Sequence, residues 1–368
     1  MRPAPLDEYP IHQSPLSMAL VTATDRNFYD RCYFNAHDRT GEVFLVTGLG
    51  VYPNLGVTDA FATVRRGDEQ WAVRFSDALD ERSLEARVGG YRVEVVEPLR
   101  RVRVVCEPAD GSVCFDLTWE GAFPAVLEDR HVLMSGPRAI LDATRFAQVG
   151  GWSGTLSVAG EELRVDPDVW VGSRDRSWGI RPVGDADPAG RLADEPLAGH
   201  WWVYAPLRFD DFGLLVIAQE SADGTRTLNH ASRVFPDGRV EQLGWPRVEI
   251  AYASGTRHPE SARLHLTTPA GEPVVVEIET LTSVALSVGA GYGGDPDWTH
   301  GQWRGRDWTS SSKYHLDDPA ITSRLPFATV DHVARATCGG AVGWGMFEHA
   351  NVGRHDPSGF ADWFATAP

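Results

Sequence analysis

Short runs in which apolar and polar residues alternate recur along the whole chain. A period of two is typical of a β-strand, whose successive side chains point to opposite faces. This pattern predicts strands over residues 42–49, 57–65, 70–75, 100–106, 112–119, 154–165, 200–208, 212–219, 227–235, 261–268, 273–279 and 329–338. Helical periodicity is weak, and only 76–87 and 318–325 are predicted as short helices.

The runs are separated by turn sequences of the Asp-Gly or Pro-x-Gly kind. These are PADG at 108–111, SADG at 221–224, FPDG at 235–238 and TPAG at 268–271, and such sequences close antiparallel hairpins. Strands that follow one another without helices between them indicate an all-β fold built from sandwiches or barrels. We therefore predict an all-β protein.

The strand pattern also indicates a division of the chain. One set of strands ends near residue 180 and another begins at His200, so we predict domains over 1–182 and 200–368. Residues 183–199, rich in Asp, Pro, Gly and Ala, are the expected linker, and 120–140, which lacks alternation, is a second candidate.

Composition removes several classes of function. The net charge of −17 argues against nucleic-acid binding and against an anionic membrane surface. No run of 18 apolar residues predicts a membrane span, and the N-terminus has no apolar segment typical of a signal peptide. The four cysteines are too sparse for a disulfide scaffold; Cys106 and Cys114 could pair across a hairpin, but free thiols in a cytoplasmic protein are favoured.

Motifs remove further classes. Lys313 is the only lysine and does not stand in a P-loop, and the chain has no H-E-x-x-H, G-x-S-x-G or C-x-x-C sequence. The run GAGYGG at 289–294 does not open a helix, so we predict a flexible loop there. Five histidines lie in or beside strands without the spacing of a compact ligand set, and we expect no metal and no cofactor.

Thirteen tryptophans are many for 368 residues. They suit ordinary core packing, with each indole N–H finding a partner. They suit equally an apolar ligand chamber that holds a few polar groups. The sequence leaves both interpretations open.

The stretch GSRDRSWGIRP, residues 172–182, is the most polar one in the middle of the chain. If it continues a strand, Arg174 and Arg176 lie on one face and Asp175 on the other. The group is then either a surface Asp–Arg ion pair or a buried Asp175. In the second case burial beside Trp178 raises the carboxyl pKa, or a neighbouring arginine lowers it.

The sequence D-x-x-W-G at 175–179, with Gly172-Ser173-Arg174 before it and Arg181-Pro182 after it, resembles the central signature of the carotenoid 1,2-hydratase (hydroxyneurosporene synthase)/AttH-like superfamily. The block Gly41-Glu42-Val43…Pro53-Asn54 and the late GWGMFEH at 343–349 are also similar to such proteins. The resemblance implies two lipocalin-like β-barrel or sandwich domains in tandem with a ligand cavity at or between them. It also implies hydratase or cyclase activity on isoprenoid or polyketide-like molecules. Arg176-Ser177 stands where a histidine is often found in the motif, which departs from a hydratase-type proton relay.

Two main hypotheses follow. The first is a cofactor-independent hydratase, isomerase or cyclase that acts on a hydrophobic isoprenoid-like or polycyclic molecule; the second is a non-catalytic carrier of lipids or apolar metabolites. A third possibility is that residues 174–179 only hold the two domains together. For the enzyme, Asp175 is the expected general acid and Glu348 or His349 the group that positions water or removes a proton. The expected ligand contacts are Trp178, Arg174, Arg181, His200, Trp202, Tyr204, Trp119 and Trp344.

Overall fold

The computed structural model describes residues 3–11, 20–80, 83–135, 138–186, 198–325 and 328–368, and they form two antiparallel sheets. The first sheet contains β1 (Phe28–His37), β2 (Val43–Tyr52), β3 (Val57–Arg66), β4 (Glu69–Ala78), β5 (Ala86–Val88), β6 (Tyr91–Glu97), β7 (Arg101–Cys106), β8 (Val113–Gly121), β9 (Val126–Leu127), β10 (His131–Ser135), β11 (Arg138–Val158), β12 (Glu161–Val165), β13 (Val171–Ile180) and β21 (Trp308–His315). The second contains β14 (Gly199–Arg208), β15 (Gly213–Ser221), β16 (Arg226–Val234), β17 (Val240–Gln242), β18 (Arg247–Tyr252), β19 (Pro259–Thr267), β20 (Pro273–Ala285), β22 (Val330–Cys338) and β23 (Ala341–Gly353). The predicted all-β class is confirmed.

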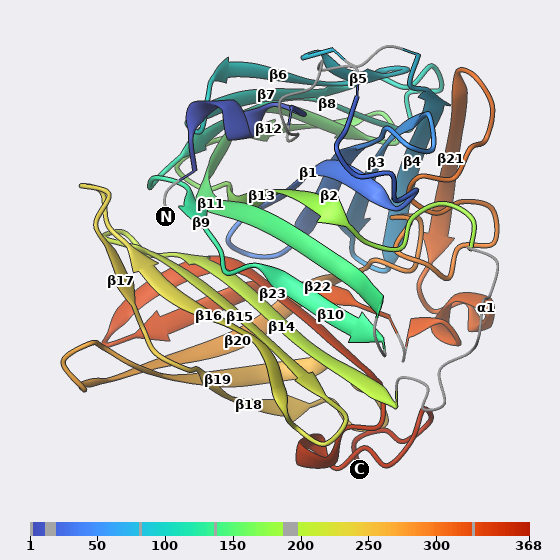
Figure 1. Ribbon diagram of the computed structural model, residues 1–368. Helices are drawn as coiled ribbons and strands as arrows, with labels where there is room; N and C mark the ends of the chain where they lie inside the picture. Colours follow the sequence, from blue (N-terminus) through green and yellow to red (C-terminus); the bar gives the residue numbers. More distant parts are fainter. Residues whose placement is uncertain (1–2, 12–19, 81–82, 136–137, 187–197, 326–327) are drawn as a thin grey trace.

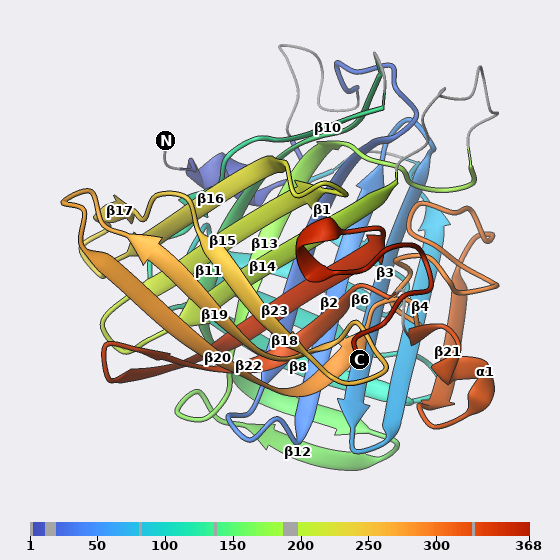
Figure 2. The same ribbon diagram turned by 90° about the horizontal axis from the view of Figure 1, so that it is seen from below.

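Each sheet curls around an apolar core of its own. In the first sheet the order β21-β4-β3-β2-β1-β13-β11-β8-β7-β6-β5 places β13 between β1 and β11. In the second the order is β17-β16-β15-β14-β23-β22-β20-β19-β18. Figure 1 shows the first sheet above the second, and Figure 2 shows β14, β22 and β23 lying across β1, β2 and β13. Both sheets are barrel-like, because each one curls around its own core.

Apolar side chains occupy three regions. Phe34, Val104 and Trp119 belong to the core inside the first sheet, and Val203, Leu264 and Phe347 belong to the core inside the second. A third cluster joins the two sheets, with Tyr33, Phe61 and Val149 from the first sheet against Tyr204, Ile217, Val333 and Met346 from the second. The outer face of β1, β11 and β13 is therefore covered by the second sheet instead of by solvent.

Two sequence predictions are wrong and one is partly confirmed. Residues 76–87 form the end of β4 and then β5, with 81–82 outside the described residues, because cross-strand pairing outweighs a weak helical spacing. Residues 120–140 are not a linker, since they contain the end of β8, then β9, β10 and the start of β11; residues 136–137 are not described. The helix predicted at 318–325 is present as α1 (Pro319–Thr322), where the Asp318 carboxylate accepts from Ala320 N at 2.8 Å.

The expected linker, 183–199, lies largely outside the described residues, because only 183–186 and 198–199 of it belong to them. Gly199 already begins β14. β21 comes from the C-terminal part of the chain but pairs with β4. The first sheet therefore takes one strand from beyond residue 200. Among the described residues no helix has the length and apolar character needed to cross a membrane.

Candidate functional site

β13 presents two chemically different faces. Asp175 stands opposite Tyr33 of β1 and Ala147 of β11, and paired residues of neighbouring strands share a face. Tyr33 and Ala147 belong to the cluster between the sheets, so Asp175 points toward the second sheet. Arg174 and Arg176 point into the first sheet's own interior, as the alternation predicts.

Both arginines of that inner face have acidic partners. Arg174 donates from Nη1 and Nη2 to the two carboxylate oxygens of Glu8 at 2.6 and 2.8 Å, and from Nε to Gln148 Oε1 at 2.9 Å. Arg176 Nη2 lies 2.7 Å from Asp30 Oδ1. The polar stretch is therefore no Asp–Arg surface pair, because its arginines bind Glu8, in a 3-10 helix at residues 5–8, and Asp30 of β1.

Asp175 lines a cavity of about 420 Å³ between the two sheets. Of the residues predicted from sequence, the cavity wall contains Asp175, Arg181, His200, Trp202, Tyr204 and Glu348. β1 adds Tyr29, Arg31 and Tyr33, and the segment 128–145 adds Glu128, His131 and Arg145. Apolar side chains, among them Leu133, Ile217 and Met346, complete a wall that is apolar with a few polar groups.

The Asp175 carboxyl has no hydrogen-bond partner among the described residues. Burial raises its pKa to about 7, and the nearby Arg145 guanidinium opposes that shift. Glu128 and Glu348 raise the pKa of Asp175 further, because an ionised Asp175 is repelled by their negative charges. The carboxyl is thus poised to hold or release a proton near neutral pH.

A second acidic group faces Asp175 from the other sheet. Glu348 of β23 stands opposite the fully buried Asp331 of β22, and Tyr33 Oη donates to Asp331 Oδ2 at 2.5 Å. Burial and the adjacent Glu348 carboxylate raise the pKa of Asp331 well above its usual value. Burial also raises the pKa of Glu348, against the Arg145 guanidinium. Two carboxyls this close share a proton more readily than they both ionise.

Arg145 carries the positive charge between these acids. It pairs with the buried Glu128, and its guanidinium lies over the ring of Tyr204 at 4.4 Å and over that of Trp202 at 5.7 Å from the centroids. The Trp202 indole N–H donates to Glu348. Trp202 and Tyr204 thereby form an aromatic wall beside the acids.

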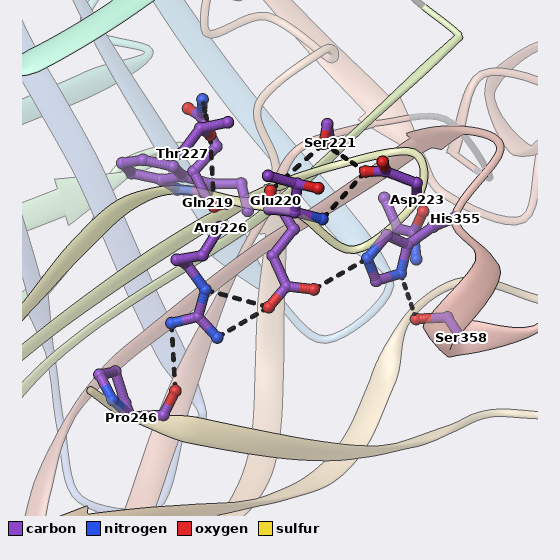
Figure 3. Close-up of polar contacts among 12 residues, drawn as sticks. Gln219, Glu220, Ser221, Asp223, Arg226, Thr227, Pro246, His355 and Ser358 are labelled. Atoms are coloured by element: carbon purple, nitrogen blue, oxygen red, sulfur yellow. Dashed lines mark hydrogen bonds and ion pairs between the residues drawn. The ribbon is translucent and has the colours of Figure 1, made fainter.

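Two neutral imidazoles complete this wall. The ring of His131 stacks on Trp202 with centroids 5.5 Å apart, and its Nε2 lies 2.6 Å from Gln219 Oε1. The Gln219 amide N–H donates to Thr227 Oγ1 at 2.9 Å, which assigns Oε1 as the atom that faces His131. Gln219 and Thr227 are labelled in Figure 3. Burial, aided by Arg145, lowers the pKa of His131 to about 4, and burial lowers that of His200 to about 4.

Five predicted site residues lie away from the cavity wall, and the alternation of their strands explains three of them. Trp178 is on the Arg174 face of β13, and His349 is on the face of β23 opposite Glu348. His349 there donates from Nδ1 to the Trp202 carbonyl oxygen at 2.7 Å. Arg174 binds Glu8, Trp119 is in the first core, and Trp344 is further along β23.

Several wall residues were missed from sequence. Tyr29, Arg31 and Tyr33 alternate with Cys32 and Phe34, so treating 28–37 as a strand would have placed them on one face. Arg145 of the wall and Asp331, which lies behind Glu348 and does not line the cavity, give no comparable signal, because only the pairing of β11 with β13 and of β22 with β23 brings them to the site.

Another polar cluster, shown in Figure 3, has its groups fully engaged. His355 lies 3.1 Å from Glu220 Oε2 through Nε2 and 2.8 Å from Ser358 Oγ through Nδ1, and Arg226 Nη2 donates to Glu220 Oε1 at 2.7 Å. The residue types are those of a Ser-His-Glu triad. However, neither the histidine nor its two partners line the cavity, and the contacts tie residues 355–358 to β15. Its role is structural.

The part of the chain that the structure describes contains no group of three or more His, Cys, Asp or Glu side chains arranged to hold a metal ion. All four cysteines are free; Cys32 and Cys106 are buried.

Solved structures share the fold. An AttH-like protein from Nitrosomonas europaea superposes with a TM-score of 0.55 at 13% identity, over 93% of this chain and 98% of that chain. Kievitone hydratase from Nectria haematococca superposes with a TM-score of 0.50 at 14% identity, over 88% of this chain and 89% of that chain. The structure of CghA with Sch210972 superposes with a TM-score of 0.51 at 12% identity, over 89% of each chain. The AttH/carotenoid hydratase-like fold expected from residues 172–182 is thus confirmed.

No curated protein sequence matches the chain. One family model does match the chain, over residues 4–361, which is nearly the full length of the chain. The chain belongs to this family, DUF8625, a family of unknown function.

Proposed function

We propose that this protein is a cofactor-independent enzyme that protonates a carbon–carbon double bond of a hydrophobic small molecule held between the two sheets. The observation that carries the proposal is the Asp175 carboxyl. It faces the cavity, has no hydrogen-bond partner among the described residues, and has a pKa of about 7 because it is buried. A general acid works best when its pKa is near the working pH.

The reaction starts with Asp175. Its proton passes to one alkene carbon, whose π electrons form the new C–H bond, and the other carbon becomes a cation. The carboxylate left behind is stabilised by Arg145, the charged group that interacts with it most strongly. The cation is balanced by the carboxylates of Asp175 and Glu348 on the cavity wall, because Arg145 already lies over the Tyr204 ring and His131 stacks on Trp202.

Glu348 is the base that completes the reaction in either of two ways. In a hydratase, water adds to the cation and Glu348, which stands opposite Asp331, accepts the proton that the water releases. In an isomerase, Glu348 accepts a proton from the adjacent carbon and a new double bond forms. In either case the proton returns to Asp175 before the next turnover, so the reaction needs no oxidant or reductant.

The shared fold supports this reaction class. Kievitone hydratase is by name a hydratase, and its fold matches most of this chain at 14% identity. At this identity the likeness concerns the fold, so the proposed chemistry depends on the geometry of Asp175 and Glu348.

Asp175→Asn tests the proposal. A panel of isoprenoid alkenes, including farnesol, is incubated in ¹⁸O-labelled water and in D₂O, and product labelling is followed by mass spectrometry. The variant should lose about 10²- to 10⁴-fold in rate, the usual contribution of a general acid. The matched control is Asp142→Asn on β11, whose carboxylate pairs with the exposed Arg130. An unchanged rate in folded Asp175→Asn overturns the proposal, and an unaltered ligand recovered from the wild type supports the carrier hypothesis instead.

A further inference from the structure

A second cavity of about 520 Å³ adjoins the first. Arg31, Arg181 and Tyr292 belong to the walls of both cavities, so these three residues stand where the two spaces meet. Arg31 Nη2 donates to Tyr292 Oη at 3.0 Å. The junction therefore holds two guanidinium groups around one phenol.

The charge of Arg31 is incompletely satisfied. The residue is only 5% exposed, and among the described residues its Nη1 has no hydrogen-bond partner. Asp59 acts on Arg31 electrostatically but its oxygens accept from Tyr52 Oη at 3.0 Å and Gly301 N at 2.6 Å. Burial also raises the pKa of Asp59 to about 7, which reduces its negative charge near neutral pH.

Arg181 also lacks an acidic partner in the described part of the chain. Its guanidinium lies over the rings of Tyr29 and Tyr292, 5.5 and 5.9 Å from their centroids. Ring faces compensate a cation only in part, and no side chain among the described residues accepts a hydrogen bond from the half-buried Arg181 guanidinium. The contrast with Arg174 and Arg176, which each bind a carboxylate, is clear.

The unused Nη1 donor of the buried Arg31 is unfavourable unless an acceptor occupies the site, and the half-buried Arg181 adds a second positive charge beside it. The planar fork of arginine matches a carboxylate, to which it donates two parallel hydrogen bonds. Ser177 stands opposite Arg31 in the β1–β13 pair and is two residues from Asp175, about 7 Å along the strand. A carboxylate held here would place the rest of its molecule beside Asp175.

We propose that Arg31 and Arg181 form a carboxylate-binding subsite, and that the substrate of this cavity is an amphipathic acid whose apolar, unsaturated body lies beside Asp175. The proposal rests on the proposed function, since it names the substrate class of the same cavity. The acid group would anchor the molecule, and the double bond that reacts would lie a few bonds away from it.

The test compares ligands that differ only in the head group. Farnesoate, its methyl ester and farnesol are titrated into the full chain, and the dissociation constants are measured by calorimetry. Farnesoate should bind at least about tenfold more tightly than the ester or the alcohol, as expected for charged hydrogen bonds. An acid that binds no more tightly than its ester, or that does not bind, overturns the proposal.

Variants assign the preference to the two arginines. Arg181→Met and Arg31→Met should each remove most of the preference for the acid and leave ester affinity within about twofold, while Arg31→Lys keeps a part of it. Arg130→Met, at an exposed ion pair with Asp142, is the matched control and should change nothing. If Arg31→Met does not fold, Arg181→Met decides alone, and a preference that survives it contradicts the proposal.

The two proposals fail separately. If farnesoate is preferred through Arg31 and Arg181 but Asp175→Asn does not affect any turnover, the subsite stands and the proposed reaction falls. If alkenes are hydrated or isomerised through Asp175 without any preference for the acid, the reaction stands and the subsite falls.

Discussion

The two faces of β13 give adjacent residues opposite environments. On the inner face Arg174 and Arg176 are buried and bind the buried carboxylates of Glu8 and Asp30. On the outer face Asp175 is directed into a cavity without a hydrogen-bond partner in the described structure, and the nearby Arg31 keeps an unpaired Nη1. Buried polar groups are normally paired. The difference agrees with a structural role for the inner face and supports the proposal that the outer face binds a ligand.

The largest effect on stability is expected on the inner face. Arg174→Met leaves the buried Glu8 without its two charged hydrogen bonds, and breaking one member of a buried ion pair destabilises by about 3–5 kcal/mol. Urea unfolding measures the change in the free energy of unfolding. Arg130→Met, which breaks the exposed pair with Asp142, should lower the free energy of unfolding by less than about 1 kcal/mol. Equal losses in the two variants would remove the contrast between internal and surface pairs.

On the outer face the expected change has the opposite sign. The folded pKa of Asp175 is about 7 against an ordinary 3.8, so the folded state binds more protons than the unfolded chain between these values. The wild type therefore loses stability as pH rises from about 4 to 7. Asp175→Asn should remove this loss and raise the free energy of unfolding by about 1–3 kcal/mol at pH 8, with little change at pH 4.

Chemical denaturation of both proteins across pH 4–8 measures this effect. A variant that is less stable than the wild type at pH 8 would mean that the ionised Asp175 has a partner that holds it, in which case residues 174–179 act as a lock between the sheets.

Tyr33→Phe should have an intermediate effect. It removes the hydroxyl that donates to Asp331 Oδ2 and leaves a buried carboxyl oxygen without that donor. The expected loss is about 1–3 kcal/mol, since an unsatisfied buried group keeps its desolvation penalty. Thermal unfolding measures the loss, and a Tyr33→Phe protein as stable as the wild type would show that the Asp331–Glu348 pair does not depend on Tyr33.

The smallest effect is expected in the cluster of Figure 3. His355→Gln removes the contact with Glu220, whose other oxygen remains bound by Arg226. A loss of about 1 kcal/mol in stability is expected. Farnesoate binding should not change, because His355, Glu220 and Arg226 do not line the cavity. A change in affinity would assign this cluster to the site.

The sequence contained the alternation of β13 and therefore the opposite directions of Arg174 and Asp175. It also contained most of the strands, because their patterns and turn sequences are local. It could not show that the face carrying Asp175 is covered by a second sheet, since that depends on contacts between residues about 150–300 positions apart, such as Tyr33 with Asp331. Trp119 and His349 were assigned to the site because tryptophan and histidine suit it chemically, whereas the faces of β8 and β23 direct them into the two cores.

The most direct test of the central claim is the pKa of Asp175. Carbon-13 NMR of aspartate-labelled protein follows the carboxyl signals across pH 3–9, and the signal absent from Asp175→Asn identifies the residue. A carboxyl that faces the cavity without a partner should titrate with a midpoint near pH 7. A midpoint at or below pH 4 would contradict the account, because Asp175 would then be ionised throughout the neutral range and could not act as the proton donor.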